Sequence, residues 1–185
     1  IDIKLGRNGN IFNNRVQNVG QGIPVMGIVY PGVAIYLDGR REAMFGINVY
    51  KNIVSNNQGN GITVLTELPA SNNDLYNINI YNNLIHGNNQ NGIAIGDRAR
   101  DINVYHNTLA QNFKSFMIKT WYDTTSGNSY VPPHHIVLRN NIFANSSENG
   151  WIRDANNITV DDNISTWNTT TGQVTYYSGV NTSAL

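Results

Sequence analysis

Six-residue runs in which apolar and polar positions alternate recur along the chain, and each run ends in asparagine. The copies superpose without gaps: INVYKN (47–52), INIYNN (78–83), INVYHN (102–107), IVLRNN (136–141) and ITVDDN (158–163), with a fainter GNIFNN at 9–14. Alternation with a period of two residues is typical of a strand that buries one face. The pattern therefore predicts a short strand in each run.

A second alternating run belongs to each repeat, and glycine or serine precedes each of its copies. These runs are VAIYL (33–37), ITVL (62–65), IAIG (93–96), FMIK (116–119), WIR (151–153) and QVT (173–175). No tight hairpin turn joins the two runs of a unit, so successive units are expected to stack their strands in parallel. The sequence thus predicts an all-β fold, a right-handed, single-stranded parallel β-helix of about six rungs with two strands per rung. A β-sandwich is the alternative.

The asparagines that end the first runs form a predicted column through the stack: Asn14, Asn52, Asn83, Asn107, Asn141 and Asn163. Asparagine tolerates the left-handed backbone conformation that a sharp corner requires. Its side-chain amide also hydrogen-bonds to an identical neighbour one rung away. We therefore expect an Asn ladder at an inward corner, and we expect loss of Asn83 or Asn107 to destabilise the fold.

Composition narrows the class of protein. The 185 residues carry no net charge, which argues against nucleic-acid binding, and they include no cysteine for disulfides or thiolate metal sites. The sequence contains no run of about 20 apolar residues, so no membrane span is predicted. The length predicts a single β-helix domain over 1–185, and the start at Ile1 without methionine suggests a fragment of a larger protein.

The stretch NINIYNNLIHGNNQNGIAIGD (77–97) resembles the repeat of the pectate-lyase-like parallel β-helix superfamily, and the resemblance extends over residues 9–175. The Asn-rich, cysteine-free texture is also similar to the β-helical core of archaeal disaggregatases. These resemblances imply an extracellular or cell-surface protein that degrades a matrix polysaccharide. They carry no catalytic motif, so the site has to come from the residues themselves.

Charged residues gather after the second run of each unit. This predicted edge holds seven of the twelve acids and six of the twelve bases: Asp38, Glu42, Glu67, Asp97, Asp101, Asp123 and Asp154, with Arg40, Arg41, Arg98, Arg100, Lys119 and Arg153. The simplest interpretation is that the edge carries solvated loops. The longest insertions, 68–76 and 121–135, also follow it, and long loops beside a rigid scaffold often build sites. The pattern therefore predicts a groove for an acidic or amino-sugar polymer.

Two chemistries fit this edge. Hydrolysis needs two carboxylates, and Asp38, Glu67 and Asp97 are candidates on consecutive units, with Asp97 one position out of column. Strand spacing puts such acids about 5 Å apart on adjacent rungs and about 10 Å apart over two rungs. β-Elimination instead needs a base such as Lys119, with the uronate neutralised by arginine or by Ca²⁺ held on the acids. Hydrolysis is slightly favoured, and no cofactor is required. The predicted substrate-binding residues are Arg40, Arg41, Arg98, Arg100, Lys119, Trp121, Tyr122 and Asp123.

Two further expectations concern surfaces. Phe12, Tyr50, Tyr81 and Tyr105 fall in one outward column, which predicts either a sugar-binding aromatic ladder or a packing surface. Neither end of the chain shows a helical cap, so we expect homo-oligomers formed by end-to-end association of the β-helix. A non-catalytic carbohydrate-binding module and a structural spacer stay open beside the enzyme.

Overall fold

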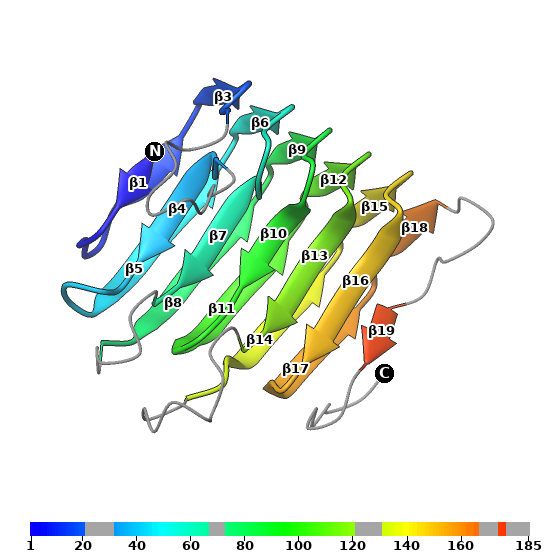
Figure 1. The fold of residues 1–185 in the computed structure, drawn as a ribbon. Helices are drawn as coiled ribbons and strands as arrows, with labels where there is room; N and C mark the ends of the chain where they lie inside the picture. The colour runs from blue at the N-terminus through cyan, green and yellow to red at the C-terminus, as the bar shows by residue number, and fades with distance from the viewer. Residues whose placement is uncertain (21–31, 67–72, 121–130, 167–173, 177–185) are drawn as a thin grey trace, which may run out of the picture.

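A computed structural model describes residues 1–20, 32–66, 73–120, 131–166 and 174–176. These residues form strands and turns without any helix, and so none that is long and apolar enough to cross a membrane. The strands lie in three parallel sheets that run along the whole stack (Figure 1). We refer to these as sheets A, B and C.

Sheet A has seven strands and faces the viewer in Figure 1: β1 (Asp2–Ile3), β4 (Ile35–Asp38), β7 (Ile62–Leu65), β10 (Asn91–Ile95), β13 (Lys114–Lys119), β16 (Glu148–Arg153) and β19 (Val174–Tyr176). Sheet B has six: β2 (Asn10–Phe12), β5 (Met44–Tyr50), β8 (Leu75–Tyr81), β11 (Ala99–Tyr105), β14 (His134–Arg139) and β17 (Asn156–Asp161). Sheet C has six short strands: β3 (Arg15–Gln17), β6 (Ile53–Ser55), β9 (Leu84–His86), β12 (Thr108–Ala110), β15 (Ile142–Ala144) and β18 (Ile164–Thr166).

Each rung contributes one strand to each sheet, and every strand pairs in parallel with its counterpart in the next rung. In sheet B, for example, Ile78 of the third rung pairs with Ile47 below it and Ile102 above it. Six rungs from β1–β3 to β16–β18, followed by β19, confirm the predicted parallel β-helix. The β-sandwich is excluded, because a sandwich is built from antiparallel strands.

The prediction of two strands per rung is wrong, because each rung has three. The missed strands are those of sheet C, which begin directly after the column asparagines. Each of these strands has three residues, and the middle one packs into the apolar core, as the burial of Val54, Ile85 and Leu109 shows. A run that short carries no readable alternation.

The interior is the predicted stack of aliphatic side chains. Ile35, Ile62 and Ile93 occupy one inward position of sheet A on three successive rungs, and each is 0% exposed. Phe116 takes the next level, where its ring lies 5.4 Å from that of Phe143. Burial of this continuous apolar stack supplies most of the stabilisation of the coil.

The corner between sheets B and C differs from the prediction in one respect. The left-handed residue is not the column asparagine but the residue before it. Lys51, Asn82 and His106 have φ values of 54°, 54° and 55°, and so turn the chain. The column asparagines keep an ordinary φ and point inward, where Asn52, Asn83 and Asn107 are at most 3% exposed. Turning and bonding are therefore divided between two adjacent residues.

The predicted Asn ladder is present and carries more hydrogen bonds than amide stacking alone. Asn107 donates from Nδ2 to Oδ1 of Asn141, and its own Oδ1 accepts from both N and Nδ2 of Asn83, all at 2.9–3.0 Å. The same Nδ2 lies within hydrogen-bond distance of the carbonyl oxygens of Ile80 and Tyr105. One side chain thus satisfies polar groups on three rungs.

A second ladder, which the sequence patterns did not reveal, follows sheet C. Asn57 donates to Asn88, and Asn88 donates to Asn112, at 2.7 and 2.8 Å. These three side chains are buried, and Ser146 continues the column by accepting from the Asn112 main chain. Asparagine therefore lines two corners of the coil.

Gly150 provides a test of core packing. A Cβ atom at Gly150 would lie 2.1–2.6 Å from three ring atoms of Phe116, whose ring is 1% exposed and has little room to move. We expect Gly150→Ala to lower the free energy of unfolding by about 1–3 kcal/mol, as overpacking does. Chemical denaturation measures this, with Gly20→Ala as control, because a Cβ there meets nothing within 4 Å. Equal stabilities of the two variants would contradict the packing described here.

Candidate functional site

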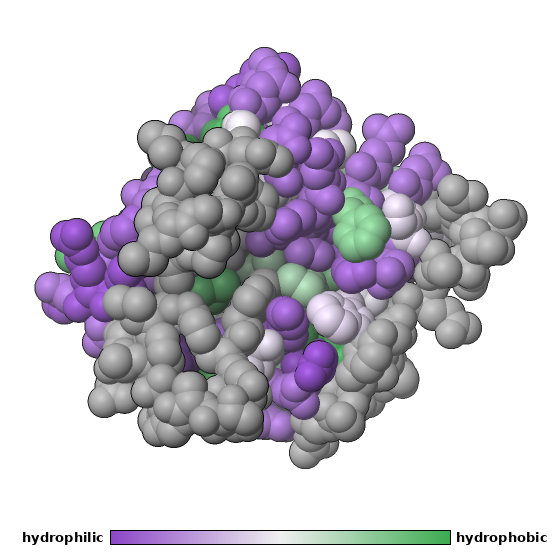
Figure 2. Space-filling view, in the orientation of Figure 1, coloured by the Kyte–Doolittle hydropathy of each residue, from purple (hydrophilic) through white to green (hydrophobic). Residues whose placement is uncertain are grey.

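The outer face of sheet A is withdrawn from solvent in the middle of the stack. Outward-pointing Thr63, Ala94 and Met117 are only 2%, 0% and 8% exposed. In the view onto this face, apolar side chains are visible between hydrophilic ones (Figure 2). Asp38, Asp97, Lys119 and Arg153 lie where the strands of this sheet end.

Asp38 ends β4 and is fully buried. Its carboxylate forms an ion pair with the Arg40 guanidinium and accepts a hydrogen bond from the Arg40 main-chain N–H at 3.0 Å. The carboxylate therefore holds the turn after β4, and its catalytic role stays a prediction. Arg41, the next predicted substrate-binding residue, is exposed.

The register separates the predicted acids. Asp38 pairs with Leu65 of β7, while Ile95 of β10 pairs with Val64. Asp97, two residues after Ile95, is thus two rungs from Asp38 and one position further along the strand direction. Glu67 lies outside the described residues, so the proposed triad of carboxylates stays a prediction.

Lys119 ends β13, three rungs beyond Asp38, and lies among charges on both sides. Burial lowers the pKa of its ammonium group, and Arg153, its partner on β16, lowers it further, while Asp97 opposes the shift in part. Its Nζ lies 5.4 Å from the ring centroid of Trp151. The neutral amine of Lys119, the form that accepts a proton, is therefore easier to reach than that of an exposed lysine.

Trp151 is a member of the site that the sequence patterns did not single out. It lies on the outer face of sheet A, beside Met117 in the register, and is partly exposed. Lys114 lies on its other side, with Nζ 5.6 Å from the ring centroid and an ion pair of 2.7 Å to Glu148. The sequence did indicate this position, because Trp151 occupies an outward position of the WIR run.

Two arginines predicted for the site are connected through one acid. Asp74 accepts from Arg98 at 3.4 Å and from Arg100 at 3.3 Å. Arg98 lies at the turn after β10 and is 8% exposed. Arg100 lies past that turn on β11, where its guanidinium covers the Tyr76 ring at 4.2 Å and bonds to Asp101 at 2.7 Å. Arg100 thus belongs to the outer face of sheet B rather than to that of sheet A.

The remaining predicted members, Trp121, Tyr122 and Asp123, lie outside the described residues. Within the described ranges, no three histidine or acidic side chains gather as metal ligands would. The Ca²⁺ option stays a prediction, because two of the acids predicted along this edge, Glu67 and Asp123, lie outside the described residues.

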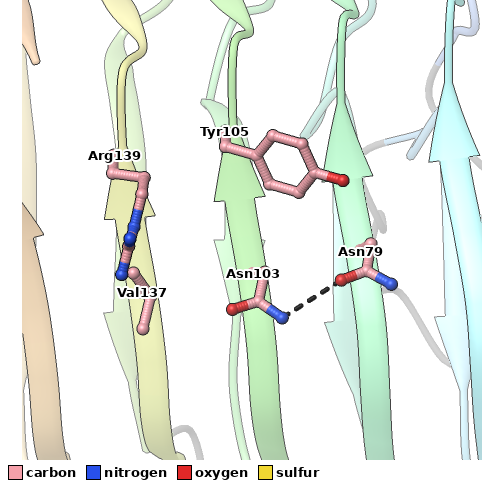
Figure 3. Close-up of a pocket in the computed structure, with 5 residues that line it drawn as sticks. All are labelled: Asn79, Asn103, Tyr105, Val137 and Arg139. Atoms are coloured by element: carbon pink, nitrogen blue, oxygen red, sulfur yellow. Dashed lines mark hydrogen bonds between the residues drawn. The ribbon is translucent and has the colours of Figure 1, made fainter.

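The outer face of sheet B carries the predicted aromatic column. Successive rings of Phe12, Tyr50, Tyr81 and Tyr105 are stacked with centroids 5.0–5.1 Å apart and planes within 5° of parallel. Burial, with a smaller contribution from Tyr81, raises the pKa of the Tyr105 hydroxyl. Beside the end of this column lies a depression of about 280 Å³ lined by Asn79, Asn103, Tyr105, Val137 and Arg139 (Figure 3).

Comparisons with known proteins find only distant structural similarity. No family model and no curated protein sequence matches it. Two solved structures to which it is similar are A-modules of the mannuronan C-5 epimerases AlgE4 and AlgE6 of Azotobacter vinelandii. The TM-scores are 0.47 and 0.43, the identities 14% and 15%, and the match covers 98% of this chain in both cases. The chain spans only 55% and 58% of those modules. So distant a likeness assigns no activity.

Proposed function

We propose that the chain is the core of an enzyme that acts on an acidic polysaccharide at the outer face of sheet A, with Lys119 as the base. The observation that carries this proposal is the lowered pKa of Lys119, with Arg153 beside it on the next rung. A general base works best when its pKa lies near the working pH, and burial beside a second cation lowers that of lysine.

The two neighbouring cations also suit the substrate. Arg153 has a guanidinium that is about half exposed and bonds to Asp154 at 3.1 Å. A uronate carboxylate placed against Arg153 would lose much of its negative charge, which makes the hydrogen at the adjacent C5 more acidic. Partly exposed Trp151 offers an apolar surface between Lys114 and Lys119 for a sugar ring.

The step balances without a redox partner. The Lys119 amine takes the C5 proton, the C5–H electrons form a C4–C5 double bond, and the C4–O bond breaks. The departing oxygen takes a proton from water or a nearby acid, leaving an unsaturated uronate and a new reducing end. Return of a proton to the opposite face of C5 would instead invert that centre without cleavage.

Hydrolysis is the second candidate, and one observation favours it. Asp38 and Asp97 lie at the same edge of sheet A on rungs two apart, which corresponds to about 10 Å from strand spacing, close to the range of inverting glycosidases. The ion pair of Asp38 with Arg40 weighs against it. An extracellular location and end-to-end self-association belong to the same proposal.

The products distinguish these chemistries. We expect the chain, incubated with uronate polymers, to release ends that absorb in the ultraviolet as unsaturated uronates, or to exchange the C5 hydrogen with deuterated water. New reducing ends without unsaturation or exchange would establish hydrolysis and remove the role of Lys119 as base. Binding without any reaction would leave a non-catalytic module, and absence of binding a spacer.

A further inference from the structure

The fifth rung interrupts two side-chain ladders on the outer face of sheet B. In the second, third and fourth rungs the strand ends in Asn-Val-Tyr or Asn-Ile-Tyr, and in the fifth it ends in Val137-Leu138-Arg139. The register places Val137 beside Asn103 and Arg139 beside Tyr105. Both ladders therefore end on the fourth rung, at the rim of the depression.

The aromatic ladder offers few ring faces to a ligand until it reaches its end. Tyr81 is stacked between Tyr50 and Tyr105 at 5.0 Å on both sides, so its two faces are covered. Tyr105 is the last ring, and the residue at the next level is Arg139 rather than an aromatic one. Apart from the T-shaped contact of the His106 ring at 5.4 Å, no described ring lies against the face of Tyr105 that is turned away from Tyr81, so a sugar ring can pack its C–H face there.

The amide ladder ends in an acceptor. Asn48 donates to Asn10, Asn79 to Asn48 and Asn103 to Asn79, with distances of 3.0–3.1 Å. Each amide thus bonds towards the first rung, and the Oδ1 atom of Asn103 is turned towards the fifth rung (Figure 3). Val137 supplies no donor there, which leaves this oxygen available to a hydroxyl group.

Arg139 differs from the other arginine of this face. Arg100 is held by Asp74 and Asp101 and covers the Tyr76 ring. Arg139 is exposed, forms no ion pair within the described part of the chain, and extends along β14 towards Val137 rather than over Tyr105 (Figure 3). Asp161 follows Arg139 in the register on β17 but forms no ion pair with it, so the Arg139 guanidinium is available to a carboxylate in the depression.

We propose that this depression is a non-catalytic subsite for one uronate unit of a polysaccharide. The sugar ring packs on Tyr105, a hydroxyl donates to Asn103 Oδ1, and the carboxylate pairs with Arg139. At about 280 Å³ the depression is smaller than most drug-sized pockets, which matches one sugar ring. The choice of uronate rests on the function proposed above, while the position of the subsite rests on sheet B alone.

Restoring the repeat should close the subsite. Val137→Asn combined with Arg139→Tyr gives the fifth rung the residues of the preceding rungs, so it extends both ladders and preserves the fold. Titration of a uronate trisaccharide, followed by calorimetry or by NMR shifts, is expected to show binding at least about tenfold weaker in this double variant and in Arg139→Gln. Arg15→Gln, which removes an exposed charge on sheet C, is the matched control and should bind as wild type does.

The outcomes separate this subsite from the catalytic proposal. Loss of trisaccharide binding in the Arg139 variants supports the subsite. This holds both when the variants keep the activity on sheet A and when the wild-type chain has no such activity. Unchanged binding in the double variant overturns it, even if the chain proves active. Equal affinity of wild type for the trisaccharide and for its carboxyl-reduced, neutral form would also overturn it, because Arg139 would then have no carboxylate to pair with.

Discussion

Replacing Lys119 with methionine is expected to lower the rate of C5 proton abstraction at least about a hundredfold, the usual contribution of a general base. Methionine keeps much of the apolar length of the side chain, and it removes a charge that burial already disfavours. The fold should therefore persist, and the loss should appear in kcat rather than only in KM. Lys114→Met is the matched control, since Lys114 lies on the same strand and beside the same Trp151 ring. A similar loss in both variants would contradict the assignment.

The pH dependence gives a second readout of the same group. Abstraction needs the neutral amine, so kcat should rise with pH up to the lowered pKa of Lys119 and then level off. Arg153 lowers this pKa, so Arg153→Gln should raise it and move the rising limb to higher pH. Asp97 raises it, so Asp97→Asn should move the limb to lower pH. Shifts of the same sign in both variants would exclude Lys119 as the titrating base.

Asn107→Ala is expected to lower the free energy of unfolding by about 2–4 kcal/mol. It removes the acceptor of the Asn83 main-chain N–H and the donor to the carbonyls of Ile80 and Tyr105, and unpaired buried groups cost about 1–3 kcal/mol each. Asn103→Ala is the control. Asn103 is exposed and its side chain forms one ladder bond, so a change of about 0.5 kcal/mol is expected. If the denaturation midpoints of Asn107→Ala and Asn103→Ala fall equally, the inner Asn ladder contributes little to the stability of the fold.

The sequence allowed the coil and its inner ladder to be predicted, because both repeat at fixed offsets. Every clear copy has isoleucine at the position of Ile78, an aliphatic residue at that of Ile80 and asparagine at that of Asn83, and the structure stacks each with its equivalents. Sheet C escaped notice because a three-residue strand has one inward side chain. The left-handed corner was misplaced by one residue, since asparagine often occupies both positions and composition alone does not separate the turning residue from the bonding one.

The candidate site was predictable only in part, because a turn after a strand can send residues that are close in sequence to different sheets. Asp97 follows one sheet A strand and Lys119 ends the next, and the two lie near one another, as their order in the repeat indicates. Arg100 is only three residues beyond Asp97, yet the turn at Arg98, with φ of 62°, carries it to sheet B. Periodicity fixes the rung of a residue within the strands, but not its direction after a strand ends.

A structure of the chain with a bound uronate oligosaccharide tests directly whether Lys119 is the base of a site on sheet A. We expect a sugar unit on the outer face of sheet A, with its C5 about 3–3.5 Å from Nζ of Lys119 and its carboxylate at Arg153. In the Lys119→Met variant, which should not turn over the ligand, the same pose is expected. An oligosaccharide that binds at the sheet B depression alone, with the sheet A face empty at saturating ligand, would contradict the claim.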